Sequence, residues 1–357
     1  MCVWRNTSHE LDSFAPSILH KLAVVELPVH LLAAYIILFK TPPTMKSVKG
    51  MMLIMHLCGA YLDLFISALS NQYFLFPAAA GYTQGLYTSM GVPIRWQGYM
   101  YVNGLCLAGV SILGFFENRF TAVVRGKRSS LLHEPKRLCY IVGNYIFAFV
   151  FIFPITFTAP EQSYGKAYVR EILPCVPLEI IEHPKFFVYA IDVTLLTCII
   201  SFASVTITLQ CIYFFSRTLI YLSSRKAKSQ RTYTLQLHFF IALSIQIIIP
   251  ICAIISPVGY IAFACATSHF DQALNNIFVN VIALHGLLSS VVMLAVHKPY
   301  RLAVIEIIRC KYLDKKLKSS IVHVDGTTVL PSGHRISINP HGSSGGSLGL
   351  HKYASVE

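Results

Sequence analysis

The sequence predicts an all-α membrane protein built as a bundle of seven transmembrane helices. Hydrophobic residues make up 55% of the 357 residues and charged residues only 13%, whereas about a quarter of a soluble domain is charged. The hydrophobic residues also gather in blocks of about 20, the length that a helix needs to cross a bilayer core. Because backbone groups exposed to lipid must be satisfied within their own segment, we interpret the blocks as helices.

Seven hydrophobic blocks follow one another along the chain. The fifth block is longer than a bilayer requires, which fits a tilted helix. Residues 71–93 are apolar but interrupted by Pro77, Gly81 and Gly85, so we expect the frayed end of the second helix followed by a partly buried loop. The blocks cover residues 18–39, 51–75, 97–119, 139–159, 186–215, 238–264 and 274–298, and together they define a receptor-sized membrane domain over residues 18–298.

The distribution of basic residues predicts the orientation of the chain. Of the 29 Lys and Arg residues, 23 lie in alternate linkers and in the segment after the last block, and 6 lie on the other side. Cytoplasmic loops of membrane proteins carry such an excess. We therefore expect the N-terminus outside the cell and the C-terminus inside. This topology also explains the net charge of +13, so we expect no binding to nucleic acid.

Residues 1–17 form the expected extracellular N-terminus. They include the sequence Asn6-Thr7-Ser8, which is an acceptor for N-glycosylation. Cys2, Cys175 and Cys265 lie at or near the outer face, where cysteines can oxidise. Three pairings are open and the sequence does not choose among them; Cys2–Cys175 is the disulfide that we favour.

After the last block we expect a short amphipathic cytoplasmic helix over residues 299–318 and a disordered tail over residues 319–357. Apolar residues of the helix can share one face, and its lysines would meet anionic lipid. Cys310 is placed for palmitoylation, with an unmodified thiol as the alternative. The tail is rich in Ser, Gly and His and cannot bury a core. Its histidines lack the spacing of metal ligands, so we expect no metal site.

An acid, an amide and a base end the third block at Glu117-Asn118-Arg119. On the predicted topology this triplet lies at the cytoplasmic end of the third helix. Glu117 can hydrogen-bond the guanidinium of Arg119, and a partner that offers Arg119 a better contact would break the pair. We therefore expect Glu117 and Arg119 to hold a resting state. The alternative is that Arg119 anchors the helix at the aqueous interface.

Two carboxylates lie in the apolar blocks. Asp63 is about 12 residues into the second block, which corresponds to a depth of roughly 18 Å. A carboxylate at that depth marks an ion or proton site, or else a hydrogen-bonded structural group. Asp192 lies near the outer third of the fifth block, where it faces either a ligand cavity or the headgroup layer.

Three prolines mark the last two blocks. Pro250 and Pro257 each remove a backbone hydrogen bond from the sixth block, so we expect a kinked helix whose cytoplasmic end can swing. Pro299 stops or kinks the seventh helix, and Tyr300 can then reach inward. The chain has no phosphate-binding Gly loop, no His-Glu-x-x-His and no Gly-x-Ser-x-Gly sequence. We expect no enzymatic activity and no cofactor.

Taken in order, several segments resemble the nematode serpentine receptor class H chemoreceptors, a branch of seven-helix candidate G-protein-coupled receptors. The ordered set spans nearly the whole membrane unit, and this order is more specific than any single segment. The matching segments are ILFKTPPTMKSVK (37–49), LFPAAAGYTQGL (75–86), GVP (91–93), FFENRF (115–120), LPCVP (173–177), SIQIIIP (244–250) and VHKPYR (296–301).

The resemblance implies a chemosensory receptor in the plasma membrane of sensory cilia, which detects an unknown small molecule and activates a heterotrimeric G protein. It also implies that Glu117-Asn118-Arg119 faces the G protein and that Pro250 is the kink of the sixth helix. His297, Pro299 and Tyr300 correspond to the motif that ends the seventh helix. The chain departs from the usual pattern at Phe120, Leu237, His238 and Lys298, which puts the choice of G protein in doubt more than the fold.

We expect the ligand between the outer halves of the third, fifth, sixth and seventh helices. Two other functions remain open. A seven-helix ligand-gated ion channel of the insect olfactory type would have its N-terminus inside, against the charge distribution. A transporter would need ionisable residues along a path, for which Asp63 and Asp192 are thin support. Helical periodicity assigns Tyr101, Leu105, Asp192, Ile251, Ile255 and Leu288 to the ligand pocket.

Overall fold

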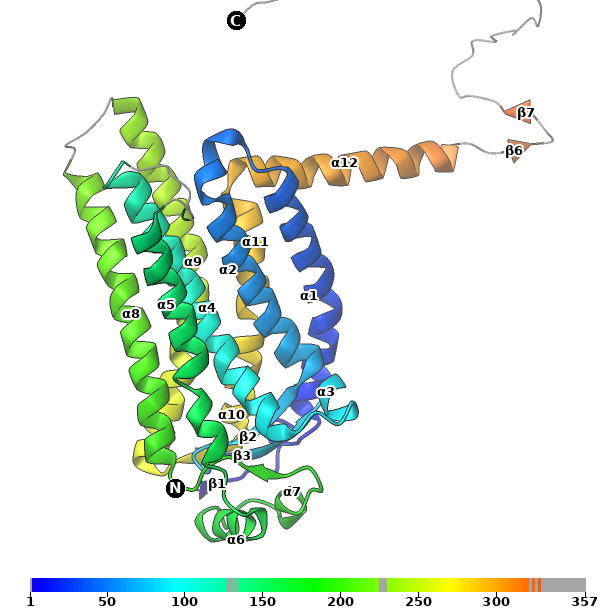
Figure 1. Cartoon of the computed structure of the whole chain (residues 1–357). Coiled ribbons are helices and arrows are strands. Elements are labelled where there is room, and N and C mark those ends of the chain that lie inside the picture. The colour runs from blue at the N-terminus through cyan, green and yellow to red at the C-terminus, as the bar shows by residue number, and fades with distance from the viewer. Residues whose placement is uncertain are drawn as a thin grey trace, which may run out of the picture. The chain divides into compact units, whose positions relative to one another are not determined.

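The computed structural model describes residues 2–126, 131, 134–224, 230–320, 323–324 and 327–328. The chain divides into two compact units, Met1–Ile305 and Glu306–Glu357. The first unit is a bundle of helices that run side by side, with a small layer of strands and short helices at one end (Figure 1). We call the end with the N-terminus the outer end and the opposite end the inner end, following the orientation that the charges predict.

Seven helical segments cross the first unit, which confirms the predicted seven-helix bundle. Six of them are long and apolar enough to span a membrane. The remaining one, α5, has 16 residues and is prolonged towards the outer end by the 3-10 helix η4. The segments are α1 (Phe14–Phe39), α2 (Lys46–Leu64) with the π-helical η2 (Phe65–Leu69), α4 (Ile94–Val123), α5 (Pro135–Val150) with η4 (Phe153–Phe157), α8 (Val193–Ser223), α9 (Gln230–Thr267), and α10 (Gln272–Ala283) with α11 (His285–Val296).

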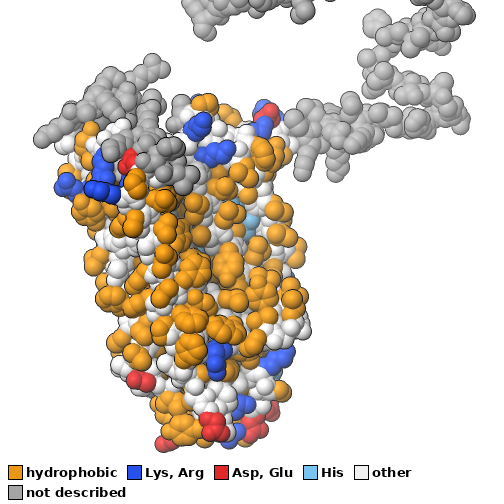
Figure 2. Space-filling view, viewed as in Figure 1, with side chains coloured by type: hydrophobic (Ala, Val, Ile, Leu, Met, Phe, Trp, Pro, Cys, Tyr) orange, Lys and Arg blue, Asp and Glu red, His pale blue; other side chains and the backbone are white. Residues whose placement is uncertain are grey.

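The surface of the bundle matches its assignment to a membrane. Figure 2 shows hydrophobic side chains covering the flank of the helices, while Lys and Arg lie near both ends and acidic residues lie mainly at the outer end. Leu31, Leu209 and Ile248 are examples of large apolar side chains that are about 60% exposed. Exposure of this extent suits contact with lipid, so the protein is a multi-pass membrane protein.

The region 71–93 corrects the prediction of a frayed helix and a loop. It forms two antiparallel strands, β2 (Asn71–Leu75) and β3 (Ala80–Gln84), followed by the short helix α3 (Leu86–Ser89). All five residues of β2 are buried, so the alternation of apolar and polar residues that marks a half-exposed strand is absent. Gly81 permits the pairing, because a Cβ there would lie 2.0 Å from the Tyr73 carbonyl oxygen.

The start of the fifth predicted helix is also corrected. Residues 187–188 form strand β4 (Phe187–Val188), which pairs antiparallel with β3, and α8 begins only at Val193. The three strands β2, β3 and β4 form one sheet. Together with α6 (Gln162–Ile172), α7 (Leu178–Ile181) and the N-terminal segment, this sheet forms a layer that we call the outer cap (residues 2–12, 71–89 and 162–189).

Three contacts attach the N-terminus to the outer cap and to the bundle. A disulfide joins Cys2 to Cys175, which is the pairing that we favoured, and Cys265 is a free thiol. Strand β1 (Cys2–Val3) pairs parallel with β5 (Phe270–Asp271). The Arg5 guanidinium donates to both Asp271 oxygens, at 3.0 and 2.6 Å, and this hydrogen-bonded pair lowers the pKa of Asp271. The N-terminal segment is thereby linked to the start of α10.

After α11 the chain continues as helix α12 (Lys298–Ser320). Its orientation towards a lipid surface stays a prediction, and the Cys310 side chain lies outside the part of the chain that the structure describes. Within residues 319–357, strands β6 (His323–Val324) and β7 (Thr327–Thr328) form an antiparallel pair. The predicted disorder of the remaining tail residues concerns positions that fall outside the described ones.

Candidate functional site

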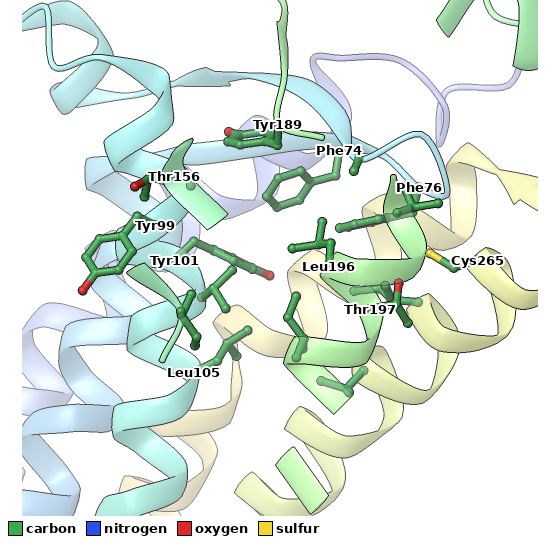
Figure 3. A pocket seen from close by; sticks show the side chains of 18 of the residues that line it. Phe74, Phe76, Tyr99, Tyr101, Leu105, Thr156, Tyr189, Leu196, Thr197 and Cys265 are labelled. Carbon is green, nitrogen blue, oxygen red and sulfur yellow. The ribbon is translucent and has the colours of Figure 1, made fainter. Parts of the chain in front are cut away.

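A cavity of about 100 Å³ lies in the outer half of the bundle (Figure 3). Helices α4, α8 and α9 and the segment η4 form its walls, and the outer cap closes it on the outer side. The cap contributes Phe74, Phe76 and Tyr189, which come from β2, the turn after it and the residue after β4. The cavity therefore depends on residues that are far apart in the sequence.

The cavity walls are largely hydrophobic, with a few hydroxyl groups. Tyr99 and Thr156 already donate their hydroxyls to backbone carbonyls, to Phe149 at 2.9 Å and to Phe153 at 2.7 Å. Tyr101 is only 5% exposed, and its hydroxyl points into the cavity (Figure 3). Such a combination of apolar walls and few polar groups is typical of small-molecule sites.

Two of the six residues predicted for the ligand pocket, Tyr101 and Leu105, line this cavity. Asp192 instead caps α8, because its Oδ1 accepts hydrogen bonds from the backbone N–H groups of Thr194 and Leu195 at 2.9 and 3.3 Å. An N-cap carboxylate satisfies donors that the helix itself leaves open.

The three predicted residues on α9 and α11 do not belong to the cavity. Ile255 and Leu288 are 47% and 45% exposed on the surface, and Ile251 is half-buried away from the cavity walls. The periodicity argument used prolines as reference points, but it had no information on how each helix is rotated about its axis. Sequence reasoning missed Phe74, Phe76 and Tyr189, because the cap strands were interpreted as a loop and as helix.

A second polar region surrounds Asp63, which is completely buried. Its oxygens accept hydrogen bonds from the backbone N–H groups of Gly286 at 3.1 Å and Leu287 at 2.6 Å. Its carboxylate also faces His285 Nδ1 at 2.7 Å and His30 Nε2 at 3.4 Å. The geometry agrees with the structural alternative for Asp63, a hydrogen-bonded group that joins α1, α2 and α11.

Further contacts extend this Asp63 cluster. Ser67 donates to Glu26 Oε2 at 2.6 Å, and His56 contacts the His30 carbonyl at 3.0 Å through Nε2. The helices also approach closely, since a Cβ on Gly286 would lie 2.9 Å from the backbone of Gly59. Small residues permit such backbone approach between membrane helices.

At the inner end the expected pair of Glu117 and Arg119 is replaced by a different one. Glu117 accepts hydrogen bonds from Arg137 of α5, at 2.8 Å from Nε and 2.9 Å from Nη2, and from Thr121 at 2.8 Å. The Arg137 and Glu117 side chains are 6% and 5% exposed. The prediction of a Glu117–Arg119 pair was wrong because residues two apart on a helix point to different sides.

Arg119 does not anchor the helix at the aqueous interface, since it is only 6% exposed. Asn118 points elsewhere and donates to the Ser47 carbonyl at 3.0 Å. The signal for Arg137 was present in the sequence, as a basic residue in the first turn of the next helix. The prediction from the sequence used Arg137 only in the count of basic residues that gives the orientation of the chain.

The inner half of α9 meets the end of α11 next to this inner region. His297 Nε2 lies 3.2 Å from Gln246 Oε1 of α9, and the Tyr300 hydroxyl lies 2.9 Å from Thr41 Oγ1. Tyr300 is fully buried, as expected of a residue that reaches inward. Pro299 occupies the second position of α12, and Pro250 lies inside the continuous helix α9.

These features define a seven-helix membrane protein of the serpentine receptor type. It has a cavity at its outer end and, at its inner end, the buried Glu117–Arg137 pair, which we call the ionic lock. The chain belongs to the family described as serpentine type 7TM GPCR chemoreceptor Srh, whose model matches residues 10–310. It is similar to serpentine receptor class H-72 of Caenorhabditis elegans, with 29% identity over 306 residues, which cover 84% of this chain and 86% of that protein.

Proposed function

We propose that the chain is a chemosensory G-protein-coupled receptor, which binds a small molecule in the outer cavity and activates a heterotrimeric G protein at the inner end. The proposed role is signalling without catalysis or a cofactor, at the plasma membrane of sensory cilia. Family membership supports the receptor class. One helix carries the argument for the mechanism: α4 lines the cavity with Tyr101 and Leu105 and bears Glu117 and Arg119 at its inner end.

The proposed mechanism uses α4 as a rigid link. Leu105 and Glu117 are about 18 Å apart along the helix axis at 1.5 Å per residue. A small rotation of α4 at the cavity would therefore also move Glu117 in the ionic lock. A ligand shifts the receptor only through a difference in affinity between the resting and active states. In the active state the Glu117–Arg137 contact opens and the G protein offers Arg119 new acceptors.

Helix α9 is the second moving part in this proposal. Pro250 interrupts its backbone hydrogen bonding between the cavity and the inner end. The inner part of α9 is held to α11 by the Gln246–His297 contact. Ligand-induced motion of α9 about Pro250 would separate these two side chains and expose the buried Arg119.

The test compares signalling by the wild-type receptor and Arg119→Glu, matched for surface level, in a chemosensory neuron under calcium imaging. An odorant and metabolite panel is applied, and Arg217→Glu, at an exposed position of α8, controls for charge reversal. We expect the response to be lost in Arg119→Glu and retained in Arg217→Glu. A response that survives in Arg119→Glu and without functional G proteins would contradict the proposal and favour a ligand-gated channel.

A further inference from the structure

We propose that the outer cavity selects a small uncharged molecule with one hydrogen-bond-accepting oxygen on an apolar body, such as a ketone, and that Tyr101 is its recognition residue. This inference rests on the proposed function, because it concerns the ligand of the same site. Size, charge and the state of the hydroxyl groups in the cavity each narrow the chemistry of the ligand.

The size of the cavity sets the first limit. Its volume is about 100 Å³, and an apolar cavity of about 150 Å³ is known to accept benzene. Because the cavity is smaller than the one that accepts benzene, it holds a ligand of about four to six non-hydrogen atoms without rearrangement of the walls. The rings of Phe74, Phe76 and Tyr189 close the cavity on the side of the outer cap, which excludes a long chain from projecting in that direction.

The charges around the cavity set the second limit. Among the lining residues that the structure describes, Arg95 carries the single charge, and it is exposed. The nearby carboxylate of Asp192 is engaged at the N-terminus of α8. An ionic ligand would lose its hydration without gaining a buried partner of opposite charge, which costs several kcal/mol. The cavity therefore favours an uncharged ligand.

The hydroxyl of Tyr101 sets the third limit. The Tyr101 residue is only 5% exposed. Its hydroxyl makes no hydrogen bond to the residues that the structure describes. It points into the cavity (Figure 3). A buried hydroxyl without a partner loses about 1–3 kcal/mol relative to a satisfied one. An acceptor oxygen on the ligand would restore this hydrogen bond, with the apolar body against Leu105 and Leu196.

Tyr189 adds a second donor at the cap. Its hydroxyl is buried and lacks a hydrogen-bond partner among the described residues. Gly98 leaves room for the Tyr189 ring, because a Cβ there would lie 2.2 Å from Tyr189 Cε1. The Tyr189 backbone N–H also donates to the Ala79 carbonyl at 2.9 Å. By contrast, Thr197 and Ser201 line the cavity but are only half-buried. A hydrogen bond to a ligand would therefore stabilise their hydroxyls less.

The experiment measures binding without the G protein. Full-length receptor in lipid nanodiscs is thermally unfolded in the presence of cyclopentanone, cyclopentane, butanoate or butylammonium, which all have about five or six non-hydrogen atoms, and the affinities follow from ligand-induced stabilisation. We expect cyclopentanone to bind about tenfold more tightly than cyclopentane and both ions to bind most weakly. Tyr101→Phe keeps the ring and should remove the tenfold preference, while Tyr99→Phe, whose hydroxyl is already bonded to Phe149, should retain it.

Several outcomes would overturn the inference. They are equal binding of cyclopentanone and cyclopentane, tighter binding of either ion, a preference that persists in Tyr101→Phe, and no binding of any of the four probes. None of these results decides whether the receptor couples to a G protein, which Arg119→Glu tests separately. Conversely, a wild-type receptor that shows Tyr101-dependent binding but activates no G protein would contradict the proposed function and leave the ligand class standing.

Discussion

The Asp63 cluster and the outer cavity differ in how their buried polar groups are satisfied. Both oxygens of Asp63 accept backbone hydrogen bonds and both also face histidines. In the outer cavity, Tyr101 is nearly as buried, yet its hydroxyl has no partner among the described residues. A satisfied polar group holds helices together, whereas an unsatisfied group on a cavity wall is available to a ligand. The difference separates a structural cluster from a binding site within one bundle.

The largest effect is expected from removing the centre of the Asp63 cluster. Asp63→Ala leaves two buried backbone N–H groups without their Asp63 acceptor and removes the carboxylate that His30 and His285 face. We therefore expect the free energy of unfolding to fall by about 3–5 kcal/mol. Thermal unfolding of the purified receptor measures this loss. The control is Asp192→Ala, which removes only a helix cap and should cost about 1 kcal/mol. Equal losses in the two variants would mean that the Asp63 cluster is no structural centre.

The ionic lock at the inner end should show a related but smaller effect. Arg137→Gln leaves the Glu117 carboxylate buried without its bidentate partner, so we expect a loss of about 3 kcal/mol. The double variant Glu117→Gln/Arg137→Gln removes the unpaired charge and should recover part of the stability. A double-mutant cycle on unfolding free energies measures the coupling. Additive losses would show that the pair contributes no coupling energy.

The disulfide of the outer cap tests whether the cavity depends on its outer wall. Cys2→Ser opens a covalent link between residues 173 positions apart, and we expect a loss of about 2–4 kcal/mol in the stability of the cap and weaker binding in the cavity. Chemical reduction of the wild type should produce the same shift in the melting temperature. Cys265→Ser alters a free thiol and serves as the control. Reduction should lower the melting temperature of this variant by the same amount as that of the wild type.

The smallest effect is expected from the pair formed by Arg5, whose side chain is 48% exposed, and Asp271. Arg5 lowers the pKa of Asp271, so this contribution to stability is present above the ordinary aspartate pKa of about 3.9 and is lost as the pH falls through the lowered pKa. The melting temperature of Arg5→Gln should therefore lie slightly below that of the wild type at pH 7, and the difference should vanish in acid. A difference that grows in acid would contradict this linkage.

Much of the fold follows from local features of the sequence. The length of each hydrophobic run sets the number of helices, because a bilayer crossing needs about 20 helical residues wherever the segment lies in the chain. The motifs in chain order indicated the receptor family, which the comparisons confirm. Tyr101 and Leu105, which helical periodicity assigned to the ligand pocket, both line the outer cavity, and their contact with a ligand stays a prediction.

Other features depend on contacts between distant segments. The partner of Glu117 is Arg137 on another helix, and the outer wall of the cavity comes from strands β2 and β4 and the residues next to them. Hydrophobic patterns cannot specify these contacts, because lipid-facing and core-facing side chains of a membrane helix are equally apolar. The number and type of helices are therefore a property of local composition. Their rotation, their ionic partners and the cap over the cavity result from packing across the whole bundle.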